Sequence, residues 1–238
     1  MEPSSVGVPV PEWTPPPRPP REPIVGRHCR VEPLNIADHA AALFATDALD
    51  AAGQSWTYLP YGPFATLAEY TVWLERTACG DDPLFHTLLD AAGAPIGVAA
   101  YLRIDPANGT IEVGHVHFSP LLQRTVAATE AMYLMMRRAF ALGYRRYEWK
   151  CNALNMPSRR AAQRFGLSYE GIFRQAAVIK GHNRDTAWFA AIDGEWPALE
   201  AAFERWLDPA NFDESGRQRV GLGQLTAPIL VARDPALG

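Results

Sequence analysis

The chain has 238 residues, 48% of them hydrophobic and 20% charged, with a formal net charge of −4. This is ordinary globular composition, and it allows one domain with a sizeable core. The mildly acidic balance argues against broad binding to nucleic-acid phosphates, and no apolar run approaches the roughly 18 residues that cross a bilayer. The start of the chain lacks the apolar core of a signal peptide. The three cysteines are widely spaced, as in a reduced protein. We therefore expect a cytoplasmic protein without nucleic-acid or membrane partners.

The two ends of the chain differ from its middle. Residues 1–23 hold many of the prolines, including Pro15 to Pro17 and Pro19 to Pro20. Because proline fixes φ and lacks an N–H, this arm should be extended. It can be a docking peptide, but an arm that packs on its own domain or lacks fixed structure is the simpler interpretation. The chain is again irregular after Asp208. We therefore predict an N-terminal arm (1–23), a domain (24–207) and a C-terminal tail (208–238).

Between the ends, strand and helix patterns alternate. A short strand over 28–33 precedes two helices, over 36–49 with Asn35 as N-cap and over 67–77. Apolar strands follow over 84–89 and 95–104. A turn sequence joins the latter to an alternating strand over 110–118, which indicates a hairpin.

From Gln123 the apolar spacing changes to four and three. One helical stripe is formed by Ala128, Met132, Met135, Ala139 and Leu142, and it ends at Gly143. A strand over 144–151 and a helix over 155–165 follow, the helix ended by Gly166. Two strands (169–180 and 186–192) and a helix (195–207) close the domain. The order predicts an α+β fold, a mixed sheet flanked by helices.

The most informative segment joins the strand over 110–118 to the helix after Gln123. A helix N-terminus offers unpaired N–H groups and a partial positive charge, which suit a pyrophosphate. The loop adds small residues and further donors: Gln123, Arg124, Thr125, Ala127 and Ala128. Any strand-to-helix turn shares part of this pattern, so the segment alone does not identify a ligand.

Four motifs in order resemble one family. Gln123-Arg-Thr-Val-Ala-Ala resembles the Q/R-x-x-G-x-G/A pyrophosphate loop of the GNAT acyltransferases, and Ala128-Thr-Glu-Ala resembles the A-T-E-A of their RimJ/RimL-like, ribosomal-protein N-acetyltransferase branch. Ile111-Glu-Val-Gly is similar to that branch's A-E-I-G strand. Two later segments match its C-x-x-x-N-x-x-S and R-x-G-F-x-x-E-G, and they begin at Cys151 and Arg164. The resemblance covers roughly residues 26–207.

The resemblance implies a single GNAT-type domain with a central mixed, mostly antiparallel sheet. Two parallel strands, here 110–118 and 144–151, would splay apart and hold acetyl-CoA or another acyl-CoA. The implied cofactor contacts are Phe118, Ser119, Gln123, Arg124, Thr125, Val126, Ala127, Ala128, Asn155 and Ser158. Val126 replaces the family's first loop glycine, so its side chain must point away from the pyrophosphate. Ser158 would protonate the leaving thiolate. The alternative is that Asn155 and Ser158 have only a structural role, as the cap and first turn of the helix.

The general base is the least determined role. The place of a family glutamate after Glu170 is taken here by Ala177, which leaves Glu112; the alternative is that Glu112 pairs with an arginine such as Arg103. His115 and His117 are two residues apart and share one face of the predicted strand, and histidine has an unperturbed pKa near 6.5. His117 is therefore a catalytic candidate, and a water chain would need no named base. No third ligand accompanies the two histidines, so no metal site is expected.

The aromatic loop Gln54-Ser-Trp-Thr-Tyr-Leu-Pro-Tyr-Gly-Pro-Phe resembles a W-x-x-L-P-Y-G-like segment of the same branch. The acceptor pocket would then be formed by Trp56, Tyr58 and Tyr61, with His115. The alternative is that the aromatic residues only anchor the loop to the core. Two arginine pairs, Arg145-Arg146 and Arg159-Arg160, are expected on solvated faces.

The implied reaction is direct transfer of an acetyl group to the primary amine of a small molecule or a peptide N-terminus. The alternatives are a non-catalytic acyl-CoA sensor, suggested by Val126 and Ala177, and a relative that uses another activated acyl donor. Because many relatives dimerise, a homodimer is a further expectation.

Overall fold

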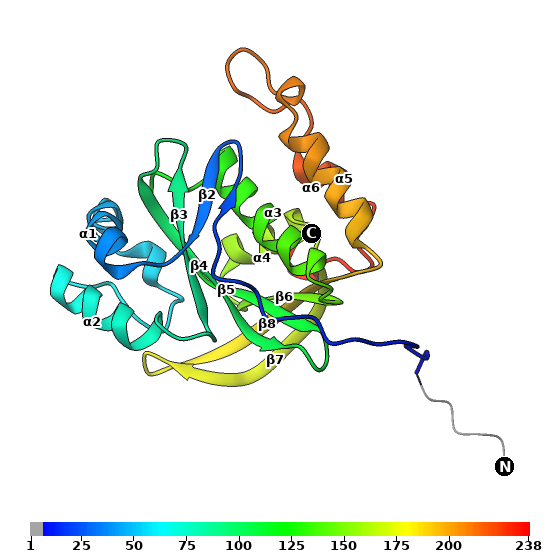
Figure 1. Cartoon of the computed structure of the whole chain (residues 1–238), viewed down its shortest axis with the longest axis horizontal. Helices are drawn as coiled ribbons and strands as arrows, with labels where there is room; N and C mark the ends of the chain where they lie inside the picture. Colours follow the sequence, from blue (N-terminus) through cyan, green and yellow to red (C-terminus); the bar gives the residue numbers. More distant parts are fainter. Residues whose placement is uncertain (1–6) are drawn as a thin grey trace.

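The computed structural model describes residues 7–238, which form one eight-stranded sheet with helices on both faces (Figure 1). The strands are β1 (Ile24–Val25), β2 (Cys29–Pro33), β3 (Leu84–Asp90), β4 (Pro95–Asp105), β5 (Thr110–Phe118), β6 (Arg146–Asn152), β7 (Ser168–Ile179) and β8 (His182–Ile192). Their order is β1-β2-β3-β4-β5-β6-β8-β7, and only β5 and β6 are parallel neighbours. The predicted mixed, mostly antiparallel sheet is thus confirmed.

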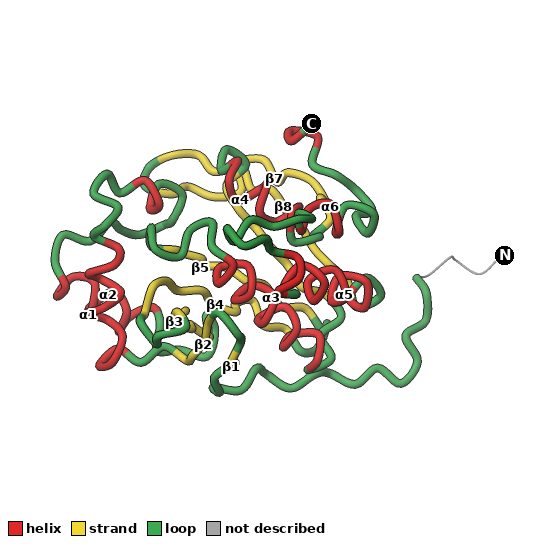
Figure 2. The backbone as a smooth tube through the Cα atoms, turned by 90° about the horizontal axis from the view of Figure 1, so that it is seen from above, coloured by secondary structure: helices red, strands yellow, loops and turns green. Residues whose placement is uncertain are grey.

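The helices are α1 (Ile36–Asp47), α2 (Leu67–Thr77), α3 (Val126–Ala141), α4 (Met156–Arg164), α5 (Trp196–Leu207) and the short α6 (Leu222–Thr226). Single 3-10 turns lie at η1 (Gln54–Trp56), η2 (Pro209–Asn211) and η3 (Pro235–Leu237). Two buried apolar clusters hold the helices to the sheet: α3 and α5 belong to one, and α1 and α2 to the other. Figures 1 and 2 show α1 and α2 well apart from α3 and α5.

The glutamate of the Ala128-Thr-Glu-Ala motif has a structural task. Glu130 is buried in α3, and its carboxylate accepts the backbone N–H groups of Arg27, His28 and Cys29 over 2.9, 2.6 and 3.0 Å. A Cβ at Gly26 would lie 2.5 Å from the same carboxylate, so the close approach requires glycine there. This contact fixes the β1–β2 turn against α3 and explains the motif without assigning it to catalysis.

A β-bulge interrupts the alternation of β5. The register with β4 shifts between Gly114 and His117, and His115 has a φ of 51°. Ile111 and Val113 pack in the α3 cluster, whereas the ring of His115 lies 4.9 Å from that of Phe85, in the α1/α2 cluster. Strict alternation over 110–118 would place Ile111 on the same face as both histidines; that expectation is wrong, because the bulge inserts one residue into β5 and reverses the faces after it.

The two chain ends lie against the domain. In the described part of the arm, the Trp13 indole donates to the Ala107 carbonyl over 3.1 Å, and Arg21 pairs with Asp81 over 2.9 Å. In the tail, Asp234 is buried and forms a 2.5 Å ion pair with Arg159, which is 4% exposed. The expectation that Arg159 is solvated is therefore wrong, because the tail supplies its carboxylate. No helix within residues 7–238 is long and apolar enough to cross a membrane.

Candidate active-site cleft

A cleft opens where β5 and β6 separate. The two strands pair only between Thr110–Val113 and Arg146–Trp149, after which β5 stays with β4 and β6 stays with β8. The separation leaves one edge of β5 without a strand partner over residues 114–118, and a cavity of about 490 Å³ lies there. The predicted splay of two parallel strands is confirmed.

The N-terminus of α4 forms one side of this cleft. Asn155 Oδ1 caps the helix by accepting the Ser158 N–H over 3.2 Å, and both side chains line the cavity. Ser158 Oγ accepts the Trp149 indole N–H over 2.9 Å. Since that bond uses an oxygen lone pair, the Ser158 hydroxyl hydrogen remains available to a ligand.

The loop before α3 is shaped by its own side chains. Thr125 is the N-cap: its Oγ1 accepts the Ala128 N–H over 3.1 Å and donates to the Leu122 carbonyl over 2.7 Å. Gln123 Nε2 donates to the Phe118 carbonyl over 2.9 Å, and Arg124 has a φ of 62°. These bonds hold the chain in the tight turn that starts the helix.

The first turn of α3 presents free backbone donors. Among residues 7–238 the N–H groups of Val126 and Ala127 have no backbone or side-chain acceptor, as is normal for a helix start. The Val126 side chain packs against the α3 core cluster. It therefore points away from the position that a phosphate would take on these donors. Ser119 is different: it is fully buried, and its N–H already donates to the Ile96 carbonyl over 3.1 Å.

Glu112 lies in a chain of ion pairs on the face of the sheet opposite to α3. Its Oε2 accepts from Arg103 Nη1 over 2.5 Å and lies 2.9 Å from Lys150 Nζ. Lys150 also pairs with Glu148 over 2.6 Å, and its Nζ lies 3.7 Å from the centre of the Trp188 ring. The expected alternative, a pairing of Glu112 with Arg103, is thus observed. The other oxygen, Oε1, lies beside Gly114, and Glu112 lines the cleft.

The two histidines are held by different partners. His115 lines the cleft, and its Nδ1 is 2.9 Å from the Tyr61 hydroxyl. Burial and then the charge of Arg103 lower the pKa of His115 to about 4, so its ring is neutral at neutral pH. His117 is 2% exposed, lies outside the cleft wall and stacks on Trp56 with ring centres 3.7 Å apart.

The hydrogen bonds of Ser55 determine which nitrogen of the His117 ring carries a hydrogen. Its Nε2 lies 2.9 Å from Ser55 Oγ, which also lies 2.6 Å from Asp50 Oδ2. A carboxylate only accepts, so the single Ser55 hydrogen points to Asp50 and His117 must donate from Nε2. His117 Nδ1 lies 3.3 Å from Asp47 Oδ1. The two nitrogens thus face Ser55 and Asp47, and His117 does not line the cleft.

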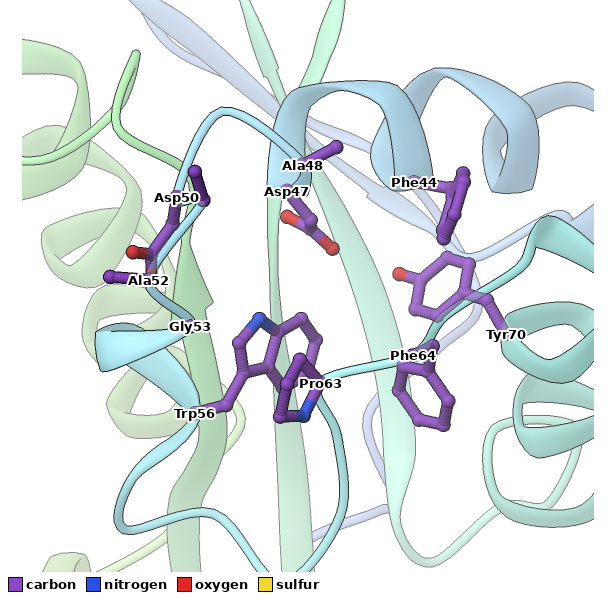
Figure 3. Close-up of a pocket in the computed structure, with 11 residues that line it drawn as sticks. Phe44, Asp47, Ala48, Asp50, Ala52, Gly53, Trp56, Pro63, Phe64 and Tyr70 are labelled. Atoms are coloured by element: carbon purple, nitrogen blue, oxygen red, sulfur yellow. The ribbon is translucent and has the colours of Figure 1, made fainter.

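The aromatic loop contributes to two cavities. Tyr58 lines the cleft, whereas Trp56 faces a second cavity of about 250 Å³ with Asp47 and Tyr70 (Figure 3). Tyr61 packs on Trp73, with ring centres 4.2 Å apart, and lines neither. Of the three aromatic residues predicted for the acceptor pocket, the structure therefore brings Tyr58 to the cleft and uses the other two as packing.

Comparison with known proteins agrees with this geometry. The family model of the acetyltransferase (GNAT) domain matches residues 29–168, which is more than half of the chain. The chain belongs to the GNAT acetyltransferases. A GCN5-related N-acetyltransferase from Brucella melitensis is 50% identical and has a TM-score of 0.89, over 92% of this chain and 100% of that one. No curated protein gives a significant match.

Two more solved structures extend the comparison. A GNAT-family acetyltransferase from Chromobacterium violaceum ATCC 12472 is 40% identical, with a TM-score of 0.77 over 83% of this chain and 100% of that one. RimL, a ribosomal L7/L12 α-N-protein acetyltransferase solved with coenzyme A, is 20% identical over 71% of this chain and 97% of its own; its TM-score of 0.59 shows a shared fold. The GNAT chain described here is thus an N-acetyltransferase that uses acetyl-CoA.

Groups in the cleft and beyond its lining suit acetyl-CoA in this GNAT enzyme. The free N–H groups of Val126 and Ala127, which lie outside the lining of the cavity, offer a phosphate site at a helix N-terminus, and the unpaired edge of β5 offers backbone partners to a pantetheine arm. Asn155 and Ser158 line the same cavity. Sequence reasoning missed Ser55, Lys150 and Arg184, which also line it. Lys150 could have been found, because a lysine alternating with Glu148 within an apolar strand is unusual in a core.

Proposed function

We propose that this enzyme acetylates the primary amine of a small molecule or of a single chain end that enters the cleft. The entrance is bridged by the aromatic loop: Tyr58 donates to the Leu154 carbonyl over 3.1 Å, and Lys180 Nζ donates to the carbonyls of Trp56 and Gly62 over 3.0 and 2.8 Å. Such bridges favour a thin acceptor over a lysine on a folded surface. A peptide N-terminus is supported by the shared fold with RimL, whose name states that it acts on a protein α-amine.

The observation that carries the proposal is that Glu112 and Ser158 line one cavity from the two sides of the splay. An acceptor amine is protonated in water and must lose a proton before it can attack. Glu112 Oε1 supplies a carboxylate oxygen in the cleft, while Arg103 and Lys150 hold Oε2. Gly114 adds no side chain over that oxygen. Glu112 is therefore proposed as the group that takes the amine proton.

Ser158 is proposed to act on the donor side. Acetyl-CoA brings an acetyl thioester, whose sulfur leaves as a thiolate that a nearby proton donor stabilises. Trp149 Nε1 donates to the Ser158 oxygen, so the hydroxyl can give its own hydrogen to the neighbouring Cys151 sulfur or to the departing thiolate. Asn155 is proposed to bind the pantetheine arm, and the loop from Gln123 to Ala128 to bind the pyrophosphate through the Val126 and Ala127 N–H groups.

The test is Glu112→Gln, which keeps the shape of the side chain and removes its basicity. We expect kcat to fall about 100-fold, the scale of one general base, and the acidic limb of the pH–rate profile to disappear, since no carboxylate is left to protonate. Glu75→Gln, on the exposed surface of α2, makes the same charge change and should leave the profile as it is. An acidic limb that persists in Glu112→Gln would assign proton removal to another group or to water.

A further inference from the structure

The charged residues around the cleft balance one another, with one exception. The chain of ion pairs on β4, β5, β6 and β7 contains three cations and three carboxylates: Arg103, Lys150 and Arg146 with Glu112, Glu148 and Glu170. This network is therefore neutral as a whole. Arg184 on β8 also lines the cleft and lies outside the network, because within residues 7–238 it forms no ion pair with a carboxylate.

The surroundings of Arg184 offer its guanidinium few acceptors. The residue is half-buried, and among residues 7–238 its side chain makes one hydrogen bond, from Nε to Thr186 Oγ1 over 3.2 Å, and no ion pair. The residue directly opposite on β7 is Ala177, whose side chain accepts no hydrogen bond. Within the described part of the chain, both terminal NH2 groups are therefore without a partner. A guanidinium presents paired donors that match a carboxylate or phosphate in a two-point contact.

Strand geometry places Arg184 on the acceptor side of the sheet. Residues 184, 186 and 188 alternate with Ala187, Phe189 and Ala191, which are buried in the cluster packed on α3. Trp188 lies over Lys150, which pairs with Glu112. Arg184 thus shares the face of the proposed base, whereas the free N–H groups for the pyrophosphate lie at the start of α3. The donor's phosphates therefore have their own site.

Apolar side chains form much of the remaining cleft wall. They come from the aromatic loop and from the β7–β8 hairpin: Leu59, Pro60, Phe173, Ile179 and Trp188. Phe173 is 59% exposed and lies against Trp188, with ring centres 4.5 Å apart, so both rings offer apolar surface to a ligand. One charged anchor among apolar walls selects a ligand by its anionic group and accommodates an apolar body.

We propose that the acceptor is an amino-acid-like molecule, in which the primary amine accompanies a carboxylate, and that Arg184 binds this carboxylate. The inference rests on the proposed function and names the substrate class of the same cleft. The carboxylate on Arg184 and the amine near Glu112 would orient the acceptor toward the splay, and the apolar walls would cover its side chain.

Three probes separate the charge of the acceptor from its shape: phenylalanine, phenylalaninamide and phenethylamine. We expect the wild-type enzyme to favour phenylalanine in kcat/KM. Arg184→Gln should raise the KM for phenylalanine about tenfold or more, the scale of a lost charge-assisted hydrogen bond, and leave phenylalaninamide unchanged. Arg174→Gln is the matched control, because Arg174 is exposed on β7 and does not line the cleft. A wild-type preference for the amide would overturn the proposal.

A binding measurement tests the carboxylate site at Arg184 separately from acetyl transfer. Titration calorimetry with N-acetylphenylalanine and coenzyme A, which need no turnover, should show binding to the wild type and to Arg174→Gln, and a loss of about tenfold in Arg184→Gln. Ala177→Glu places a carboxylate opposite Arg184 and should cause a similar loss. Equal binding in all four proteins would overturn the role of Arg184. If the acid binds but none of the amines is acetylated, the proposed function fails while the anion site stands.

Discussion

The donor and acceptor halves of the cleft are built in different ways. The donor half consists of two short segments that organise themselves: Thr125 caps α3 by accepting the N–H of Ala128, three residues further on, and Asn155 caps α4 by accepting the N–H of Ser158 in the same manner. The acceptor half is joined by contacts between distant parts of the chain. Tyr58 reaches Leu154, and Lys180 reaches the carbonyl of Trp56, 124 residues away.

This difference indicates where the enzyme tolerates change. A self-capped helix start needs only its own few residues, so the donor half can keep one cofactor while the rest of the sequence varies. The acceptor half depends on a network of ion pairs with a buried centre at Glu112 and Lys150, where the loss of one member removes a partner of the other. We therefore expect single substitutions to have larger structural effects on the acceptor side than on the donor side.

The largest effect is expected at Lys150. Its side chain is 6% exposed and lies between Glu112 and Glu148, so Lys150→Met removes the cation that separates a buried carboxylate from a half-buried one. Breaking a buried pair in this way costs about 3–5 kcal/mol, and chemical denaturation at pH 7 measures it. Arg160→Met, on the exposed side of α4, removes the same charge and should change stability by less than about 0.5 kcal/mol. Equal effects of the two variants would contradict the comparison between the halves.

The pH dependence of the free energy of unfolding is a second test of Lys150→Met. Burial acts to raise the pKa of Glu148, but hydrogen bonds from Lys150 and Arg146 outweigh it and hold that pKa below 4.5. A carboxyl whose pKa is lowered by folding adds stability above its unfolded pKa, and this stability is lost as the pH falls through the folded value. The wild type should therefore lose stability as it is acidified below about pH 4.5. Lys150→Met should lose less over the same range, because its Glu148 has one cation fewer.

A smaller effect, confined to the reaction, is expected on the donor side. Ser158→Ala should lower kcat about tenfold or more through loss of a proton donor, with the affinity for coenzyme A nearly unchanged, since Asn155 and the α3 loop remain. Ser158→Thr keeps a hydroxyl and should retain most of the turnover. Stopped-flow release of free thiol and calorimetry with coenzyme A measure the two quantities. If Ser158→Ala and Ser158→Thr turn over at the wild-type rate, Ser158 has no part in thiolate protonation.

The same division explains how much of the molecule could be predicted from its sequence. Most helices and strands and the Asn155 cap were accessible because each depends on residues close together in the chain, whereas the splay was implied by the resemblance to the family. The polar start of β8 (His182–Asp185) and the β5 bulge were missed, since a two-residue apolar period does not reveal either. The partners of Arg159 and Lys150 come from segments that only the fold brings together. Long-range pairing of charges has no local pattern.

The smallest effect is expected at Val126, the departure of this chain from the family loop. Because the Val126 side chain packs on the α3 cluster and its N–H has no acceptor within residues 7–238, a glycine there should present nearly the same donors. We expect Val126→Gly to change the dissociation constant of acetyl-CoA by less than about threefold, well below the tenfold that 1.4 kcal/mol represents. It should lower the free energy of unfolding by about 1 kcal/mol, through a freer backbone and a lost apolar contact. Calorimetry and chemical denaturation measure both quantities. A tenfold gain in affinity would show that the valine restricts the pyrophosphate site, and the donor half would then depend on more than its local caps.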